Sequence, residues 1–259
     1  MQVSKKIRVA VIFGGRSSEH SISCISAGSV LRALDRSKYD VVPIGITKSG
    51  KWVLEADNAD RLAIQNGVFP EVDSANPAVL FTADPSAKDL VVQSNVPEVL
   101  QQVDVAFPVL HGPWGEDGTI QGLLELAGIP YVGSGVFASA AAMDKAHLKA
   151  MMQSAGLPVG PFEVVTNAQW TSQREASLTR IATLGFPVFV KPSRAGSSVG
   201  ITKVKSQADL VAAIEFARQH DPKVIVEASI ENAREIECGV LDSATGPKAS
   251  VCAEIIVRE

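Results

Sequence analysis

A glycine- and serine-rich loop is the part of this sequence best suited to chemistry. Residues 191–200 read KPSRAGSSVG and lie between two apolar, β-branched runs, which predicts a β-hairpin with a long tip. Gly196 and Gly200 permit left-handed backbone angles, so successive amides and the hydroxyls of Ser197 and Ser198 can converge on an anion. The lysine that opens the segment adds a positive charge. The pattern favours a phosphate-binding loop over a surface hairpin that merely needs glycine.

This loop matches neither of two familiar glycine signatures. A P-loop requires GxxxxGK[ST] ahead of a helix, whereas the residues after Gly200 predict a strand. A dinucleotide-binding fingerprint fits only Gly133–Ala138, and no acidic residue ends a strand about twenty positions later. We therefore interpret Gly133–Ala138 as a turn, and an NAD-linked enzyme is the least favoured function.

Three charged residues outside the loop support phosphate binding. Lys145 falls in the first turn of a predicted helix, where the helix dipole disfavours a cation by about 0.3–1 kcal/mol, and a nearby anion would explain it. Glu227 ends an apolar run and Glu235 follows eight residues later, an order suited to an adenine amino group and then to ribose hydroxyls. Taken alone, each of these side chains also fits an ordinary surface charge.

The first half of the chain has the pattern of an α/β protein. Four apolar runs of strand length occur at 7–13, 41–46, 103–109 and 129–132. A helical pattern follows the first run, and another occupies 119–127. Strand, glycine turn, helix and strand is the order typical of a parallel sheet, so residues 1–138 are predicted to form one α/β domain. Residues 50–100 carry little signal.

The second half predicts a helix, a hairpin, a second helix and two strands. The helices are expected at 143–155, with Asp144 as N-cap, and at 206–220. The hairpin strands are expected at 187–191 and 199–204, and the later strands at 224–227 and 236–241.

The composition is that of an ordinary soluble protein. The net charge is −4 and no basic stripe occurs, so nucleic acid and anionic lipid are not expected as partners. No apolar run approaches the length of a membrane span, and the sequence predicts a cytoplasmic location. The three cysteines, Cys24, Cys238 and Cys252, lie far apart; we expect buried, unpaired thiols in a reducing compartment.

Four segments, in this order along the chain, resemble the D-alanine–D-alanine ligases of the ATP-grasp superfamily. They are GGRSSEHSIS (14–23), HGPWGEDGTIQG (111–122), MDKAHLK (143–149) and KPSRAGSSVG (191–200). The resemblance covers essentially the whole chain. It implies a Rossmann-like parallel α/β domain (1–138) followed by an incomplete ATP-grasp fold, with a central subdomain at 139–225 and the start of a C-terminal subdomain at 226–259.

The resemblance also implies a nucleotide site. Lys145 and Lys191 would contact the α- and β-phosphates of ATP, and a lid over the phosphates would be formed by Gly196, Ser197 and Ser198. Glu227 would accept a hydrogen bond from the adenine amino group, and Glu235 would hold the ribose.

A substrate site is implied at the other end of the phosphates. Glu19 would bind the ammonium group of the first D-alanine and anchor Ser197, while His111 and Glu116 would line the site. One D-alanine carboxylate would attack the γ-phosphate to give an acyl phosphate, which the amine of the second D-alanine would then attack. The product would serve peptidoglycan precursor synthesis, and a homodimer is expected.

The chain departs from the family pattern at its end. The family continues past Glu259 with a mobile loop, an oxyanion arginine and the acidic and amide ligands of two Mg²⁺ ions. We therefore expect a truncated chain with no metal ligands of its own and little activity. Two alternatives stay open: a ligase that uses D-lactate or another D-amino acid, and an inactive nucleotide-binding fragment.

Overall fold

Strand β1 (Ile7–Gly14) lies inside the larger of the two main sheets of the protein. The structure, a computed structural model, describes residues 5–81, 85–86, 90–93, 98–100 and 102–256. β1 pairs in parallel with β2 (Tyr39–Ile46) on one side and with β7 (Val105–Pro108) on the other. The predicted parallel βαβ start of the chain is therefore confirmed.

Four antiparallel strands extend this sheet beyond β2. They are β3 (Trp52–Leu54), β4 (Ala78–Phe81), β5 (Leu90–Gln93) and β6 (Glu98–Leu100), and the sheet order is β6-β5-β4-β3-β2-β1-β7. A 3₁₀ turn, η1 (Ala59–Leu62), lies between β3 and β4. These strands fall in the segment that the sequence pattern left without an interpretation.

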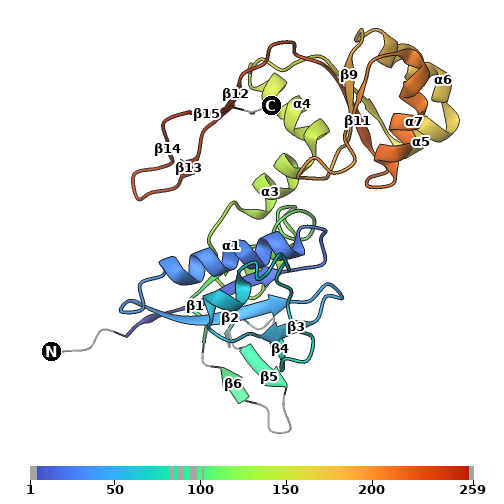
Figure 1. Cartoon of the computed structure of the whole chain (residues 1–259). Helices are drawn as coiled ribbons and strands as arrows, with labels where there is room; N and C mark the ends of the chain where they lie inside the picture. Colours follow the sequence, from blue (N-terminus) through green and yellow to red (C-terminus); the bar gives the residue numbers. More distant parts are fainter. Residues whose placement is uncertain (1–4, 82–84, 87–89, 94–97, 101, 257–259) are drawn as a thin grey trace.

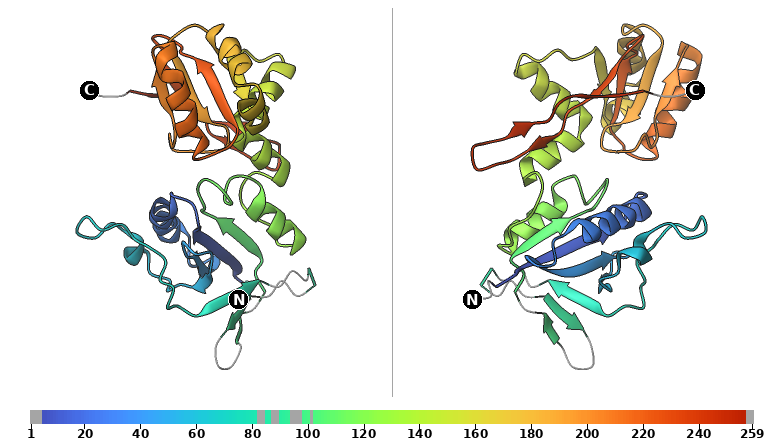
Figure 2. Two further views of the ribbon diagram at one scale, coloured as in Figure 1. Left: turned by 90° about the vertical axis from the view of Figure 1, so that its right-hand side faces the viewer. Right: turned by 60° about the vertical axis from the view of Figure 1, so that its left-hand side comes forward.

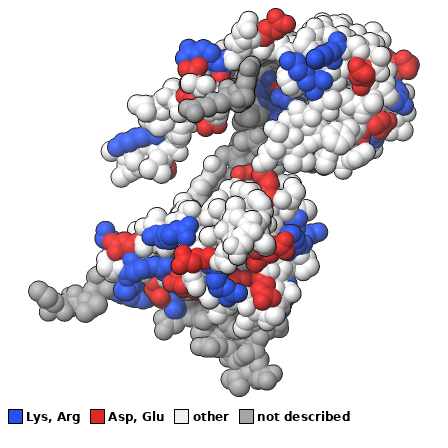
Figure 3. Space-filling model, in the orientation of Figure 1, with Lys and Arg blue, Asp and Glu red and all other residues white. Residues whose placement is uncertain are grey.

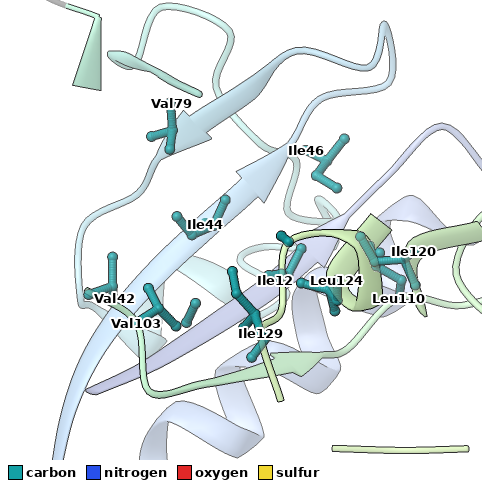
Figure 4. Packing of buried hydrophobic residues seen from close by; sticks show 13 residues of the cluster. Ile12, Val42, Ile44, Ile46, Val79, Val103, Leu110, Ile120, Leu124 and Ile129 are labelled. Atoms are coloured by element: carbon teal, nitrogen blue, oxygen red, sulfur yellow. The ribbon is translucent and has the colours of Figure 1, made fainter. Parts of the chain in front are cut away.

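Alternation along β1 divides the core of this sheet into two layers. Val9, Val11 and Phe13 pack with residues of helix α1 (His20–Ala33) on one face. Ala10 and Ile12 point to the other face, where they pack with Ile120 and Leu124 of helix α2 (Thr119–Leu126). Figure 4 shows this second layer, in which side chains from β1, β2 and α2 meet.

Two consecutive helices connect the first sheet to the second. α3 (Val136–Met143) follows the glycine turn at 133–135, and α4 (Lys145–Ser154) follows directly with Asp144 as its N-cap, as predicted. Figure 1 shows α3 between the two sheets and α4 beside the second sheet. The glycine turn therefore opens a helix that the sequence reading did not predict.

The second sheet is antiparallel, in the order β10-β9-β11-β8. Its strands are β8 (Phe162–Val165), β9 (Val188–Pro192), β10 (Thr202–Val204) and β11 (Val224–Ala228). β9 and β10 form the predicted hairpin around the glycine- and serine-rich loop. The helices that cover one face are α5 (Asn167–Ser172), α6 (Arg174–Ala182) and α7 (Gln207–Arg218) (Figure 1).

Strand alternation in this sheet decides which side chains can form a site. Val188 and Val190 of β9 and Val224 and Val226 of β11 are fully buried against the helices. Lys191 and Glu227 come next along their strands and therefore point to the opposite face, toward α4. The sheet thus separates its apolar core from its charged residues.

The last described residues form a narrow ribbon that extends from the body of the protein (Figures 1 and 2). β12 (Glu235–Glu237) pairs with β15 (Ala253–Ile255), and β13 (Val240–Leu241) pairs with β14 (Lys248–Ala249). The single strand predicted at 236–241 is therefore wrong, because the pairing breaks between β12 and β13.

Two other sequence expectations are also corrected or left open. The strand predicted at 129–132 is reduced to one bridge between Ala106 and Tyr131. The predicted domain limits at 138 and 225 stay a prediction. Among the helices that the structure describes, none is both long and apolar enough to cross a lipid bilayer.

Helix α2 supplies a matched test of the first core. Leu124 is fully buried, whereas Leu126 on the same helix is 72% exposed. We expect Leu124→Ala to lower the free energy of unfolding by about 2–5 kcal/mol, because it leaves a cavity in close-packed surroundings. Leu126→Ala should change it by less than about 0.5 kcal/mol. Urea unfolding followed by circular dichroism measures both, and equal effects would contradict the packing described for α2.

Candidate functional site

The base of the glycine- and serine-rich loop is fastened to the start of α4. Ser193 accepts a hydrogen bond from the amide of Lys145 at 3.0 Å, and its own amide donates to the carbonyl of Lys223 at 2.9 Å. Its hydroxyl donates to Asp144 Oδ1 at 2.7 Å. Ser193 is fully buried, so these bonds fix the position at which the loop leaves the sheet.

Asp144 holds this junction as an ionised carboxylate. Its side chain accepts hydrogen bonds from the first amides of α4 and from the ammonium group of Lys223. Burial alone would raise the pKa of Asp144, but the hydrogen bonds from Lys223 and Ser193 outweigh it and hold the pKa well below its ordinary value. The N-cap therefore also anchors the loop.

A second ion pair holds the next residue of the loop. Arg194 donates two side-chain hydrogen bonds to the buried carboxylate of Asp221, at 2.7 and 3.0 Å, and its amide donates a third at 2.8 Å. This two-pronged geometry is the strong form of an arginine–carboxylate pair. Ser193 and Arg194 therefore form a rigid stem from which the tip of the loop extends.

The tip itself has unused amides. Within the described residues, the backbone amides of 195–198 have no hydrogen-bond acceptor. Ser197 and Ser198 adopt left-handed φ values of 47° and 58°, and Gly200 has φ 72°. The left-handed angle expected at Gly200 is present, but the other left-handed positions are the two serines rather than Gly196. Such a run of free amides, with two successive left-handed residues, is suited to binding an anion.

Two lysine ammonium groups lie beside this tip. Lys145 donates a hydrogen bond to the carbonyl of Ala195 at the start of the tip. Burial lowers the pKa of Lys145, and the nearby charge of Lys191 lowers it further. Two ammonium groups close enough to affect each other raise the local positive potential, which a phosphate would neutralise.

Glu227 is the carboxylate that balances these cations. It pairs with Lys191 at 2.5 Å and with Lys149, one helical turn after Lys145, at 2.8 Å. Burial would raise the pKa of Glu227, but the two lysine hydrogen bonds outweigh it and keep the pKa below its ordinary value. The structure therefore brings together Lys145, Lys191 and Glu227, as the sequence predicts, and adds Lys149.

Glu19 is the point at which the loop tip meets the first sheet. It precedes α1, and its Oε1 accepts a hydrogen bond from the hydroxyl of Ser197. A side chain at Gly112, which has φ 71°, would clash with Oε2 of the same carboxylate. Gly112 therefore lets the loop after β7 approach Glu19 closely.

His111 is held from three sides next to Glu19. Its carbonyl accepts from Ser17 at 2.8 Å, its Nε2 lies 3.0 Å from the hydroxyl of Ser26, and its Nδ1 lies 3.8 Å from Glu116 Oε1. Glu116 raises the pKa of His111 and outweighs the effect of burial, with a further contribution from the charge of Glu19. The geometry therefore favours a protonated imidazole between two carboxylates.

Two hollows open on either side of the His111 loop. One has a volume of about 380 Å³ and is lined by Gly15, Ser17, Trp114 and their neighbours. The other has a volume of about 520 Å³ and is lined by Glu116, Ser134, Ser139 and their neighbours. Both include Leu110 and His111, so the two hollows border the same loop.

Among the predicted site residues that the structure describes, Glu235 alone lies away from the two lysines, the loop tip and the His111 loop. It lies on β12 of the exposed ribbon, and within the described residues its side chain makes no ion pair or hydrogen bond. Sequence reasoning missed Lys149 and Ser26. The spacing of Lys149 four residues after Lys145 is a signal that it shares a helix face with Lys145, whereas no sequence pattern indicates that Ser26 contacts His111.

Known proteins match this chain in both of its halves. The family model for the D-ala D-ala ligase N-terminus matches residues 8–134, and that for the D-ala D-ala ligase C-terminus matches residues 151–259. A D-alanine--D-alanine ligase of Streptomyces griseus is 55% identical over 97% of this chain and 66% of its own length. One of Mycobacterium avium is 54% identical over 99% of this chain and 69% of its own length.

Solved structures share the fold. The VanG D-Ala:D-Ser ligase from Enterococcus faecalis matches 96% of this chain and 70% of its own with a TM-score of 0.83 and 39% identity. The D-alanine-D-alanine ligase from Coxiella burnetii matches 97% of this chain and 69% of its own with a TM-score of 0.80 and 32% identity. The predicted α/β fold class is thereby confirmed.

The fold and the charged face of the second sheet define an ATP-grasp protein. Within that class, the chain belongs to the D-alanine–D-alanine ligase family. It spans about two thirds of the length of the curated relatives it matches. The expected truncation and low activity stay predictions.

The raised pKa of His111 can be tested directly. We expect NMR titration of its imidazole to give a pKa above 6.5, and Glu116→Gln to move that pKa down. A raised pKa means that any stability this histidine contributes is present at low pH and is lost as the pH rises through that pKa. Glu125→Gln, an exposed change on α2, is the control. An equal response to both changes would contradict the Glu116 assignment.

Proposed function

We propose that this chain binds ATP between α4 and the charged face of the second sheet and uses it to join two D-alanine molecules. The observation that carries the proposal is the free amides of residues 195–198 beside the ammonium groups of Lys145 and Lys191. This set of donors fits the phosphates of a nucleotide. Family membership supplies the reaction to which such a site belongs.

At the nucleotide end, Lys145 and Lys191 contact the α- and β-phosphates and the tip at Gly196, Ser197 and Ser198 covers them. Glu227 accepts from the adenine amino group. Its carboxylate already accepts from two lysines, which keeps it ionised and therefore a strong acceptor. The ribose role of Glu235 rests on the family resemblance alone.

At the substrate end, Glu19 receives the ammonium group of the first D-alanine. One oxygen of Glu19 accepts from Ser197, and the other faces Gly112. The carboxylate of this D-alanine attacks the γ-phosphate, which gives an acyl phosphate. The amine of the second D-alanine then attacks the acyl carbon and phosphate leaves, so the residues chiefly position reactants and stabilise charge.

His111 and Glu116 line the substrate end of the site, and Glu116 affects the charge of the His111 imidazole. Because the pKa of His111 is raised, its imidazole stays protonated to higher pH than a free histidine. A protonated imidazole donates hydrogen bonds and stabilises negative charge, and it cannot accept a proton from the attacking ammonium group. We therefore propose that His111, in its protonated form, contributes electrostatic stabilisation.

Magnesium is implied by the family, and the described residues present no ligand cluster of their own for it. Among them, no group of three or more His, Cys, Asp or Glu side chains is placed to share a metal ion. We therefore derive no step through the metal. The expectation that its ligands lie outside this chain gains no support from the comparisons.

Family membership supports three further proposals. They are a cytoplasmic location, supply of the dipeptide to peptidoglycan synthesis, and a homodimer. Basic and acidic side chains are interspersed over the face in Figure 3, in keeping with a small-molecule enzyme. The expected absence of nucleic-acid and membrane partners stays a prediction.

A second candidate is a ligase that joins D-alanine to a different second substrate. The structural likeness to a D-Ala:D-Ser ligase at 39% identity favours keeping it. The lysines and Glu227 serve both reactions equally, so only the products separate the two candidates.

The phosphate role of Lys191 predicts a change in nucleotide affinity. Lys191→Ala should weaken ATP binding by about 1–3 kcal/mol, because a charge-assisted hydrogen bond is lost. Lys203→Ala is the control, since Lys203 lies on the facing strand of the same hairpin and is exposed. Isothermal titration calorimetry measures both. Unchanged affinity in Lys191→Ala, or equal losses in the two variants, would remove the assignment.

Turnover tests the proposed reaction. The chain is mixed with ATP, Mg²⁺ and D-alanine; ADP is followed by a coupled assay and the product is identified by mass spectrometry. We expect ADP release that depends on D-alanine, with D-alanyl-D-alanine as product. ATP binding without D-alanine-dependent ADP release would favour the inactive nucleotide-binding fragment. A mixed product in competition with D-serine or D-lactate would favour the second candidate.

A further inference from the structure

The three cysteines of the chain have different surroundings. Cys24 is fully buried under β1, and burial raises its pKa to about 12, which keeps it an unreactive thiol. Cys238 and Cys252 are both exposed and unpaired. The expectation of three buried thiols is therefore confirmed for Cys24 and wrong for the other two, which lie in the ribbon that carries β12–β15.

The two exposed cysteines directly follow the last register pair of β12 and β15. That pair is Glu237 with Ala253, so the next position along each strand is Cys238 and Cys252. Facing residues of a regular antiparallel pair have Cα atoms about 4.5–5.5 Å apart, which sets the scale for neighbouring positions at the end of this ladder. Disulfides occupy Cα separations of about 4.4–6.8 Å.

The local pairing beyond this point keeps the cysteines together. Gly239 and Ser250 resume the contact between strands, since the Ser250 amide donates to the Gly239 carbonyl at 2.8 Å. Cys238 alone then faces two residues, Val251 and Cys252, which is the arrangement of a β-bulge. The Sγ of Cys238 lies 3.4 Å from the Ser250 carbonyl, so this thiol leans across toward the strand that bears Cys252.

We propose that Cys238 and Cys252 form a modification site, a reversible disulfide across the ribbon. Oxidation by a low-molecular-weight disulfide balances the reaction: one thiolate attacks the reagent and releases one thiol. The second cysteine then displaces the other half of the reagent as a second thiol, and the protein is left with one S–S bond. In a reducing compartment the same exchange runs backwards, so the bond forms only under oxidising conditions.

The bond would join two short ladders that the bulge now separates. Each ladder has only two or three residue pairs, and the strands are exposed throughout. Isolated pairs of short strands are marginally stable in water. A covalent link at the bulge prevents the strands from separating and so protects the ribbon from proteolysis.

Peptide mapping tests the pair directly. The folded chain is incubated with oxidised glutathione, alkylated without reduction and digested with trypsin. Cleavage after Arg234, Lys248 and Arg258 puts Cys238 on residues 235–248 and Cys252 on residues 249–258. We expect these two peptides to be joined, with two of the three thiols lost and Cys24 still free. Added dithiothreitol should restore all three thiols.

Variants distinguish a specific Cys238–Cys252 pair from the general reactivity of exposed thiols. Cys24→Ser should give the same joined peptide, whereas Cys252→Ser should leave Cys238 as a mixed disulfide with glutathione. Limited proteolysis of the oxidised and reduced wild-type chain should show slower cutting between residues 238 and 252 after oxidation. Glutathione on both cysteines without the joined peptide would overturn the proposal, as would a link formed only between two chains on a non-reducing gel.

Discussion

Like charges held close together are the constraint around which the second sheet is organised. Lys145 and Lys191 come from a helix and a strand, and the charge of Lys191 helps to lower the pKa of Lys145. Glu227 offsets this repulsion by pairing with Lys191 and Lys149. Three lysines against one carboxylate leave a surplus of positive charge, which is what an anionic ligand requires. The surrounding packing keeps that surplus beside the free amides of the loop tip.

The rigid stem of the loop is the second feature on which anion binding depends. Asp144, Ser193 and the Arg194–Asp221 pair fix the start of the loop with buried, charge-assisted hydrogen bonds, while the tip ends in residues whose amides are unbonded. The loop therefore combines a fixed base with a tip that a ligand can reorganise at small cost. A binding loop needs both properties, because pre-organisation limits the entropy lost on binding and a free tip allows entry.

Sequence reasoning succeeded where local pattern and tertiary structure agree. Lys191 at the base of the hairpin and Glu227 at the end of an apolar run were identified from local pattern, and Asp144 had a recognisable capping position. Glu19 and His111 came from the family resemblance alone; the contact of Glu19 with Ser197, for example, joins residues 178 positions apart. Lys149 was missed because its partner Glu227 is distant in sequence. The strands β3–β6 were missed because short antiparallel strands, held by tertiary pairing, show little periodicity of their own.

Gly112 and Ser197 each approach one oxygen of the same carboxylate, one through an absent side chain and one through a hydroxyl. The tip of the second sheet's loop and the edge of the first sheet thus share a single acidic group. Whatever occupies that group must compete with the serine for its lone pairs, so occupancy at Glu19 and the position of the loop are linked quantities. The two halves of the molecule are therefore coupled directly through the two carboxylate oxygens of Glu19, without a series of intermediate contacts.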